Sequence, residues 1–233
     1  MQASSTMRTI KAVVFEPVGC LAEFPAEEFN EIAASVFDVK ETARTSGSEA
    51  YWQLLGLMQQ SGNALTPAET QIVEDLEIQA AGKADLYEDV APALAELKTM
   101  NMTLVIASSL SATAISRFLE RFSLTDFFSA VWTRDNAGGV KAAPLAKAIE
   151  GTSLHPEHVM CLVDTVDGLH VAKEAGANAI LMFNDYDEGK RLAMHNPTGA
   201  IVSLHELPDA IRFVAEGAKV PRAGAARLDT RGA

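Results

Sequence analysis

Short apolar runs recur along the chain and predict the strands of a buried sheet. The first run covers residues 11–15 and ends at Pro17 and Gly19. Similar runs follow at residues 103–107, 130–132, 159–163, 179–183 and 200–202. Continuous apolar runs of this length are typical of strands that are covered on both faces, as they are in parallel sheets.

Helical patterns lie between these runs. Within residues 111–122, the apolar side chains Ile115, Phe118 and Leu119 fall on one face of a helix. Four further helices are predicted at residues 88–100, 143–150, 167–176 and 205–217. Because strands and helices alternate from residue 103 onward, the sequence predicts an α/β fold with a doubly wound parallel sheet.

Residues 22–87 interrupt this alternation, because they contain three helical patterns and no clear strand. The third helix is predicted to begin at Thr66, with a proline at its first position and Glu69 as the capping-box glutamate. We therefore expect an all-helical cap inserted into the core, with Tyr51 and Trp52 in the cap's own packing. The predicted domains are a core of residues 8–21 and 88–217, a helical cap of residues 22–87, and a mobile tail of residues 218–233.

The charge of the chain narrows the choice of partners. The 233 residues contain 19 Lys and Arg against 31 Asp and Glu, a net charge of −12. Such a surface repels nucleic-acid phosphates and anionic lipid, so neither is expected as a partner. No apolar run is long enough for a membrane span, and no secretory signal is visible, so we expect a cytoplasmic protein. Nothing in the sequence indicates its oligomeric state.

Cysteine and histidine positions argue against two kinds of site. Cys20 and Cys161, the two cysteines, both lie in apolar contexts and are predicted to be buried thiols. The five histidines show no metal-binding spacing, so a zinc site is not expected.

Polar residues follow several predicted strands, where parallel α/β sheets bind their ligands. Glu16 follows the first strand, Ser108 and Ser109 follow the run at 103–107, and Asp164 follows the run at 159–163. Lys141 stands before a predicted helix. Hydroxyl groups and a lysine at helix starts suit an anion, and carboxylates nearby suit a hard cation.

These motifs, in this order, resemble the haloacid dehalogenase superfamily, in its branch of β-phosphoglucomutase-like and phosphoglycolate-phosphatase-like enzymes with a small helical cap. The resemblance spans roughly residues 10–217, and KAVVFEPVGCL at residues 11–21 fits the family frame KAVxFDxDGTL. It implies that Ser108 contacts the transferring phosphoryl group and that Lys141 neutralises phosphate and nucleophile. It also implies that the acidic motif around Asp164 holds Mg²⁺.

The first motif, at residues 11–21, departs from the family frame at the positions on which catalysis depends. Glu16 stands at the position of the nucleophilic aspartate, and Val18 stands at the position of the acid/base aspartate. Pro17 between them has no N–H to donate to a phosphoryl oxygen. The fourth motif has Val163 ahead of Asp164, where the family often has an acidic residue. A displaced carboxylate and a missing acid/base together predict a loss of activity of about 10⁴–10⁶-fold.

The sequence therefore predicts a weakly active or non-catalytic member of this family that binds a small phosphate, another small anion, or a partner. The alternative is a working Mg²⁺-dependent phosphatase or phosphomutase acting on a small phosphate monoester. Three sets of site residues are predicted: catalytic Glu16 and Lys141; phosphate-binding Ser108, Ser109 and Lys141; and metal-binding Glu16, Asp164 and the backbone carbonyl of Val18. Mg²⁺ is expected to bind weakly or not at all. The alternative role of the serines and of Asp164 is helix capping.

Overall fold

The computed structural model describes residues 9–40, 46–62, 65–183 and 186–216. Its centre is a six-stranded sheet with the order β5-β4-β1-β6-β7-β8, and every neighbouring pair is parallel. The strands are β1 (Ala12–Phe15), β4 (Thr103–Ser108), β5 (Ala130–Thr133), β6 (Val159–Val163), β7 (Asn178–Met182) and β8 (Gly199–Ile201). The predicted doubly wound sheet is confirmed, and each strand ends within one residue of its predicted limits.

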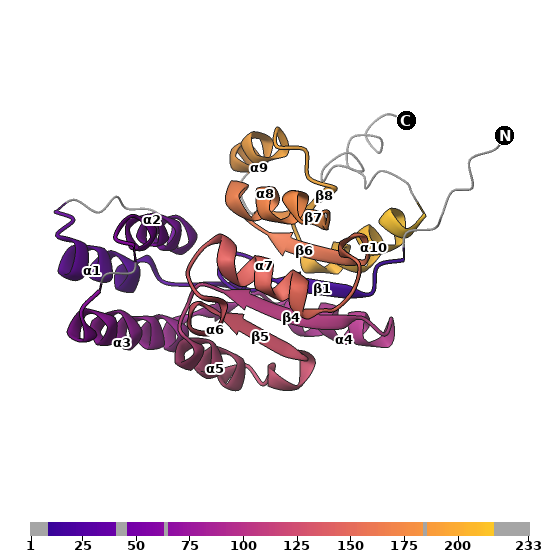
Figure 1. Cartoon of the computed structure of the whole chain (residues 1–233). Helices are drawn as coiled ribbons and strands as arrows, with labels where there is room; N and C mark the ends of the chain where they lie inside the picture. The colour runs from indigo at the N-terminus through magenta and orange to yellow at the C-terminus, as the bar shows by residue number, and fades with distance from the viewer. Residues whose placement is uncertain (1–8, 41–45, 63–64, 184–185, 217–233) are drawn as a thin grey trace, which may run out of the picture.

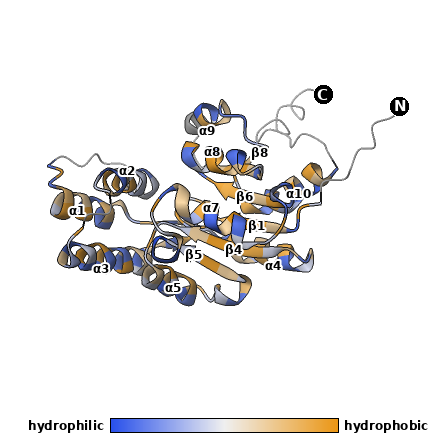
Figure 2. Cartoon of the chain, in the orientation of Figure 1, coloured by the Kyte–Doolittle hydropathy of each residue, from blue (hydrophilic) through white to orange (hydrophobic). Residues whose placement is uncertain are grey.

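Helices cover both faces of this sheet and create two separate cores (Figure 1). Along β1, Val13 and Phe15 join the core on one face, and Val14 joins the core on the other. Figure 2 shows that the central strands are largely hydrophobic, whereas the helices carry hydrophilic residues on part of their surface. The predicted helices appear as α4 (Val90–Thr99), α5 (Ala112–Arg121), α7 (Ala142–Gly151), α8 (Val166–Glu174) and α10 (Leu207–Ala215).

Two α-helices of the sheet region were not predicted, and each has a local reason. Helix α6 (Arg134–Ala137) has four residues, too few for a periodic pattern. Helix α9 (Tyr186–Ala193) is largely polar, so its sequence has no apolar stripe to reveal it. Three single turns of 3₁₀ helix lie at Thr125–Phe127, Pro156–His158 and Leu204–Glu206.

Three helices between β1 and β4 form a group beside the sheet, at the left of Figure 1. They are α1 (Ala26–Phe37), α2 (Gly47–Gln60) and α3 (Pro67–Lys83). The predicted capping box is present, because Thr66 Oγ1 accepts from the Glu69 backbone N–H and the Glu69 carboxylate accepts from the Thr66 backbone N–H. The limits of the cap, residues 22 and 87, stay a prediction, and the predicted tail lies outside the described residues.

The expectation of a strand-free insert was wrong. Strands β2 (Ala22–Glu23) and β3 (Asp85–Leu86) pair antiparallel where the chain leaves the sheet and where it returns to it. Each strand has two residues, so neither produces an alternating pattern, and their pairing joins segments that are distant in the sequence. Cys20 and Cys161 are free and buried, as predicted. None of the described helices has both the length and the apolar character of a membrane span.

Candidate functional site

The predicted site residues that follow β1, β4 and β6 meet at one edge of the sheet. Strand β1 lies between β4 and β6, and Phe15 is in register with Ile106 and Leu162. The residues after these strands are therefore neighbours in space. Glu16, Val18, Ser108 and Ser109 line one small cavity, together with residues from β4, the first loop and helix α2.

This cavity is closed by aromatic side chains from α2. Tyr51 and Trp52 both line it, and Tyr51 is 2% exposed. The volume of the cavity is about 10 Å³. That space admits at most one water molecule, so a phosphoryl group with its oxygens does not fit beside Glu16 in this arrangement.

Glu16 is a buried carboxyl group without a compensating partner. Its residue is 8% exposed, and Oε2 has no hydrogen-bond partner among the described residues. Burial raises the pKa of Glu16 well above its ordinary value, and the nearby carboxylates of Asp164 and Asp167 raise the pKa further. A raised pKa favours the protonated carboxyl group, and the protonated form is not a nucleophile.

The loop before α7 places Lys141 beside Ser109, which follows β4. Lys141 has a φ of 58°, an unusual value for a residue with a side chain, and its backbone N–H donates to Ser109 Oγ at 2.7 Å. Its Nζ lies 3.3 Å from Oδ2 of Asp167, in the first turn of α8. The ammonium group is thus paired with Asp167, and the hydroxyl oxygen of Ser109 holds the Lys141 backbone.

The serines after β4 have different local roles. Ser108 Oγ accepts from the Leu110 N–H at 3.2 Å, and Ser108 is buried at the cavity. Ser111 caps α5, because its Oγ accepts from the Ala114 N–H. Helix capping therefore describes Ser111, whereas Ser109 positions Lys141, a role that the sequence did not reveal.

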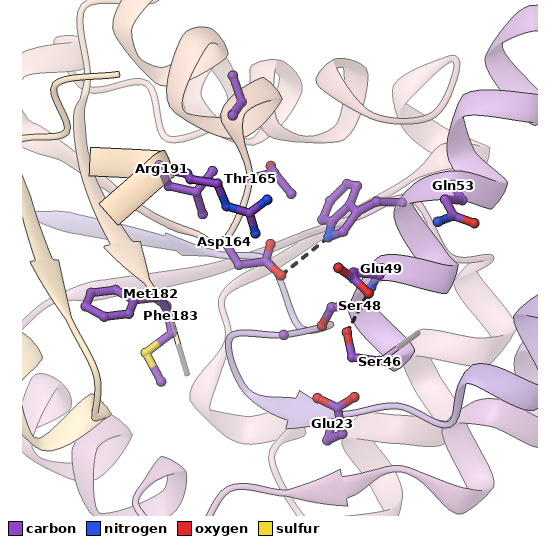
Figure 3. A pocket seen from close by; sticks show the side chains of 14 residues that line it. Glu23, Ser46, Ser48, Glu49, Gln53, Asp164, Thr165, Met182, Phe183 and Arg191 are labelled. Carbon is purple, nitrogen blue, oxygen red and sulfur yellow. Dashed lines mark hydrogen bonds between the residues drawn. The ribbon is translucent and has the colours of Figure 1, made fainter. Parts of the chain in front are cut away.

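Asp164 sits between the sheet edge and α2. Its Oδ2 accepts a hydrogen bond from Trp52 Nε1 at 3.4 Å, marked by a dashed line in Figure 3. A Cβ added to Gly19 would lie 2.0 Å from the same oxygen, and Gly19 has a φ of +80°. Only glycine fits there, because the loop after β1 packs directly against the carboxylate.

The expectation that Tyr51 and Trp52 belong to the packing of the inserted helices was only partly right. Trp52 does not belong only to the packing of the inserted helices, because its indole reaches Asp164. Tyr51 does stack against Phe29 of α1, with ring centroids 4.9 Å apart, but it also closes the cavity at Glu16. An apolar stripe shows which side of a helix is buried, not which partner covers it. Helix capping does not describe Asp164 either, since Thr165 Oγ1 accepts from the Gly168 N–H and caps α8.

A buried ion pair connects the inserted helices to the core, next to Ser109 and Ser111 after β4. Glu77 on α3 is 0% exposed and accepts from Arg134 at the start of α6, with Nη1 2.6 Å from Oε2. The same Oε2 accepts from the Ser111 N–H at 3.0 Å, and Arg134 also donates to the Ser109 carbonyl oxygen. Burial raises the pKa of Glu77, and the Arg134 guanidinium opposes that rise. The pair holds α3 against the loop after β4, which carries Ser109 and Ser111.

The donor set of this edge does not fit a tight Mg²⁺ site. Mg²⁺ binds oxygen ligands in a near-ideal octahedral arrangement. Within the residues that the structure describes, no three His, Cys, Asp or Glu side chains converge as a metal site would need. Val18 is 2% exposed and its side chain belongs to the hydrophobic core, so only its backbone carbonyl is left to join Glu16 and Asp164 as a ligand.

A larger cavity of about 640 Å³ opens on the other side of Asp164 (Figure 3). Its walls come from α2, from the chain after β1, from the start of α8, from the end of β7 and from α9. Trp52 is the one residue that lines both this cavity and the small cavity at Glu16. The sequence did not indicate this cavity, because it depends on how α9 and α2 face each other.

Comparison with known proteins connects this geometry to a family. A family model described as haloacid dehalogenase-like hydrolase matches residues 22–182, more than half of the chain. The match begins after the stretch that contains Glu16 and Val18.

Two curated relatives and one solved structure carry the comparison further. The chain is 37% identical to the enolase-phosphatase E1 of Persephonella marina over an aligned stretch of 103 residues. This stretch covers 42% of this chain and 44% of that protein. It thus spans less than half the length of that relative. It is 22% identical over 223 residues to the phosphoglycolate phosphatase of Photorhabdus laumondii subsp. laumondii, covering 90% of this chain and 95% of that protein. The structure of CbbY from Rhodobacter sphaeroides in complex with phosphate is similar in fold, with a TM-score of 0.67, 21% identity, and coverage of 88% of this chain and 100% of that one.

Proposed function

Because the chain belongs to the haloacid dehalogenase-like hydrolase family, we propose that it is a phosphatase-type member whose phosphoryl-transfer site is impaired. Its remaining role is to bind a small anion or a partner at the edge of the sheet. The observation that carries the proposal is the state of Glu16, buried and unpartnered beside a cavity of about 10 Å³.

Three features of the first motif support the loss of phosphoryl transfer. The raised pKa of Glu16 favours the protonated carboxyl group, which cannot attack phosphorus. Tyr51 and Trp52 fill the space that a phosphoryl group needs. Val18 is packed in the core and supplies no proton for a leaving group, a deficiency that typically costs about 10²–10⁴-fold in rate.

One group that suits an anion is nevertheless accessible at this edge. Ser108 is buried at the closed cavity, so the group that an anion can reach is the ammonium group of Lys141. Lys141 is paired with Asp167, whose side chain is 55% exposed, so an anion can compete for the ammonium group at little cost. Phosphatases of this family generally use Mg²⁺, and for this chain we propose weak binding at best. No step of the proposal depends on that ion.

The test is an assay of the purified protein with Mg²⁺ against a panel of small phosphate monoesters and an activated aryl phosphate. Glu16→Gln is the informative variant, and Glu174→Gln, on the exposed side of α8, is the matched control. We expect all three proteins to show the same background turnover. The double variant Glu16→Asp/Val18→Asp, which restores both family carboxylates, should hydrolyse the aryl phosphate above that background.

A wild-type turnover near the enzyme median of about 10 s⁻¹ that Glu16→Gln abolishes would contradict the proposal. That result would make Glu16 a working nucleophile or base, and the protein a functional phosphatase. An equal loss in Glu174→Gln would instead point to a general effect of removing charge from this face.

A further inference from the structure

The cavity of about 640 Å³ beside Asp164 has the size of a small-molecule site. Figure 3 shows that its walls come from two parts of the fold, with α2 on one side and the segment around α9 on the other. Only Trp52 is shared with the small cavity at Glu16. Asp164 and Gly19 also line the larger cavity, so a ligand here would lie next to the phosphoryl-transfer site, outside the small cavity at Glu16.

Two charges of opposite sign line this cavity without neutralising each other. The side chain of Arg191 on α9 has no ion pair or hydrogen bond among the described residues, and Arg191 lines the cavity from the core side. Glu49, in the first turn of α2, lines it from the opposite wall, and its carboxylate has no ion pair within the described part of the chain. Among the described residues, no salt bridge joins Arg191 to Glu49 and neither side chain has an opposite charge as an ion-pair partner.

The other carboxylates of the lining are already engaged. Glu23 accepts from the Gly47 N–H at 2.9 Å and from the Tyr87 hydroxyl at 3.4 Å, and Asp164 accepts from Trp52. They nevertheless make the lining more acidic than basic. This balance disfavours a dianionic phosphate ester and favours a ligand that also carries a positive charge.

Apolar side chains also line the cavity. Trp52 lines it from α2, and Met182 and Phe183 lie on the side of β7 (Figure 3). Aromatic and thioether groups of this kind contact the apolar body of a small ligand, and the charged groups at the ends fix its orientation.

We infer that this cavity binds a small zwitterion of the amino-acid type. Its carboxylate pairs with Arg191, its ammonium group pairs with Glu49, and its apolar body lies between Trp52 and Phe183. The inference goes beyond the proposed function, because it assigns a ligand class to the adjoining cavity and requires no chemistry at Glu16.

Calorimetric titration of the full-length protein tests this inference. The first step is a panel of free amino acids, in which at least one with an apolar side chain is expected to bind. The second step compares L-phenylalanine with phenethylamine, 3-phenylpropanoate and phenyl phosphate, which carry the cation alone, the monoanion alone and the dianion. The zwitterion should bind most tightly, and phenyl phosphate should bind most weakly.

Two exposed substitutions separate the two ends of the ligand. Arg191→Gln should weaken the zwitterion and 3-phenylpropanoate about tenfold and leave phenethylamine unchanged, since it removes one charge-assisted contact. Glu49→Gln should weaken the zwitterion and phenethylamine by a similar factor and leave 3-phenylpropanoate unchanged. Arg117→Gln, on the exposed side of α5, is the matched control and should change nothing.

Three outcomes would overturn the inference. They are the absence of binding by every amino acid of the panel, tighter binding of phenyl phosphate than of the zwitterion, and zwitterion binding that neither Arg191→Gln nor Glu49→Gln weakens. None of these outcomes bears on the phosphatase assay, because the measurement is binding rather than hydrolysis.

Discussion

Breaking the ion pair between Glu77 and Arg134 should cost more stability than breaking any exposed ion pair among the described residues. The Glu77 side chain is 0% exposed and the Arg134 side chain is 12% exposed, so water screens neither charge well. Glu77→Gln removes the carboxylate and leaves the guanidinium buried. The Ser111 N–H keeps an acceptor in this variant, because the glutamine side chain retains one carbonyl oxygen.

The expected cost follows from these contacts. Removing one partner of a buried pair typically costs about 3–5 kcal/mol. Asp135 lies 3.7 Å from Arg134 Nε and compensates part of the charge, so we expect the lower end, about 3 kcal/mol, for Glu77→Gln. Glu77→Leu also leaves the Ser111 N–H without its acceptor, which adds about 1–3 kcal/mol. The double variant Glu77→Leu/Arg134→Met replaces both charges by apolar groups and should recover most of this loss.

Urea unfolding, followed by circular dichroism, measures these free energies. Glu77→Gln should also lower the thermal midpoint by about 6–12 °C, from about 2–4 °C per kcal/mol for a chain of this size. Glu74→Gln is the matched control, because it removes the same charge from the same helix at a residue with no ion pair among the described residues. Its free energy of unfolding should stay within about 0.5 kcal/mol of the wild-type value.

Two results would refute this reasoning. The first is a Glu77→Gln variant that loses less than about 1 kcal/mol, which is the range of exposed ion pairs. The second is a double variant whose loss of stability equals the sum of the losses of Glu77→Leu and of Arg134→Met measured alone. Contacting partners should instead show a coupling energy of about 1–3 kcal/mol.

Two further predictions concern the residues around the small cavity. Because burial raises the pKa of Glu16 above its ordinary value of 4.5, the folded state keeps a proton that the unfolded chain releases, and stability should fall as the pH rises from 4.5. Glu16→Gln should flatten this slope in thermal unfolding with a chelator present, and a slope equal to that of the wild type would contradict the assigned state of Glu16. Inorganic phosphate should stabilise the wild type by about 1.4 kcal/mol at about ten times its Kd. Lys141→Ala should remove this stabilisation, and an unchanged effect would place the anion elsewhere.

Much of the fold follows from local patterns that are visible in the sequence. The apolar runs of β1, β4 and β6 identify buried strands, because a strand covered on both faces has no polar side. The rule that ligands bind at the carboxyl ends of parallel strands then brings Glu16, Ser108 and Asp164 to one edge. The departures of Glu16 and Val18 from the family frame are also visible in the sequence, and with them the expectation of impaired chemistry.

The tertiary structure decided what lies opposite each of these residues. Tyr51 and Trp52 belong to an apolar stripe whose sequence does not say that it covers the cavity at Glu16 and reaches Asp164. Ser109 holds the backbone of Lys141 through a contact between different loops. These contacts depend on the packing of α2 and of the loop before α7, which no local pattern records.

The same limit applies to the charges. Glu77 and Arg134 lie on separate elements, and their meeting in the interior depends on the angle at which α3 packs against the core. Arg191 and Glu49 form the two ends of the larger cavity because α9 and α2 stand on its opposite sides. A sequence records periodicity and order along the chain, but a cavity is the space that side chains from distant segments leave open, and its size and lining exist only once those segments are packed.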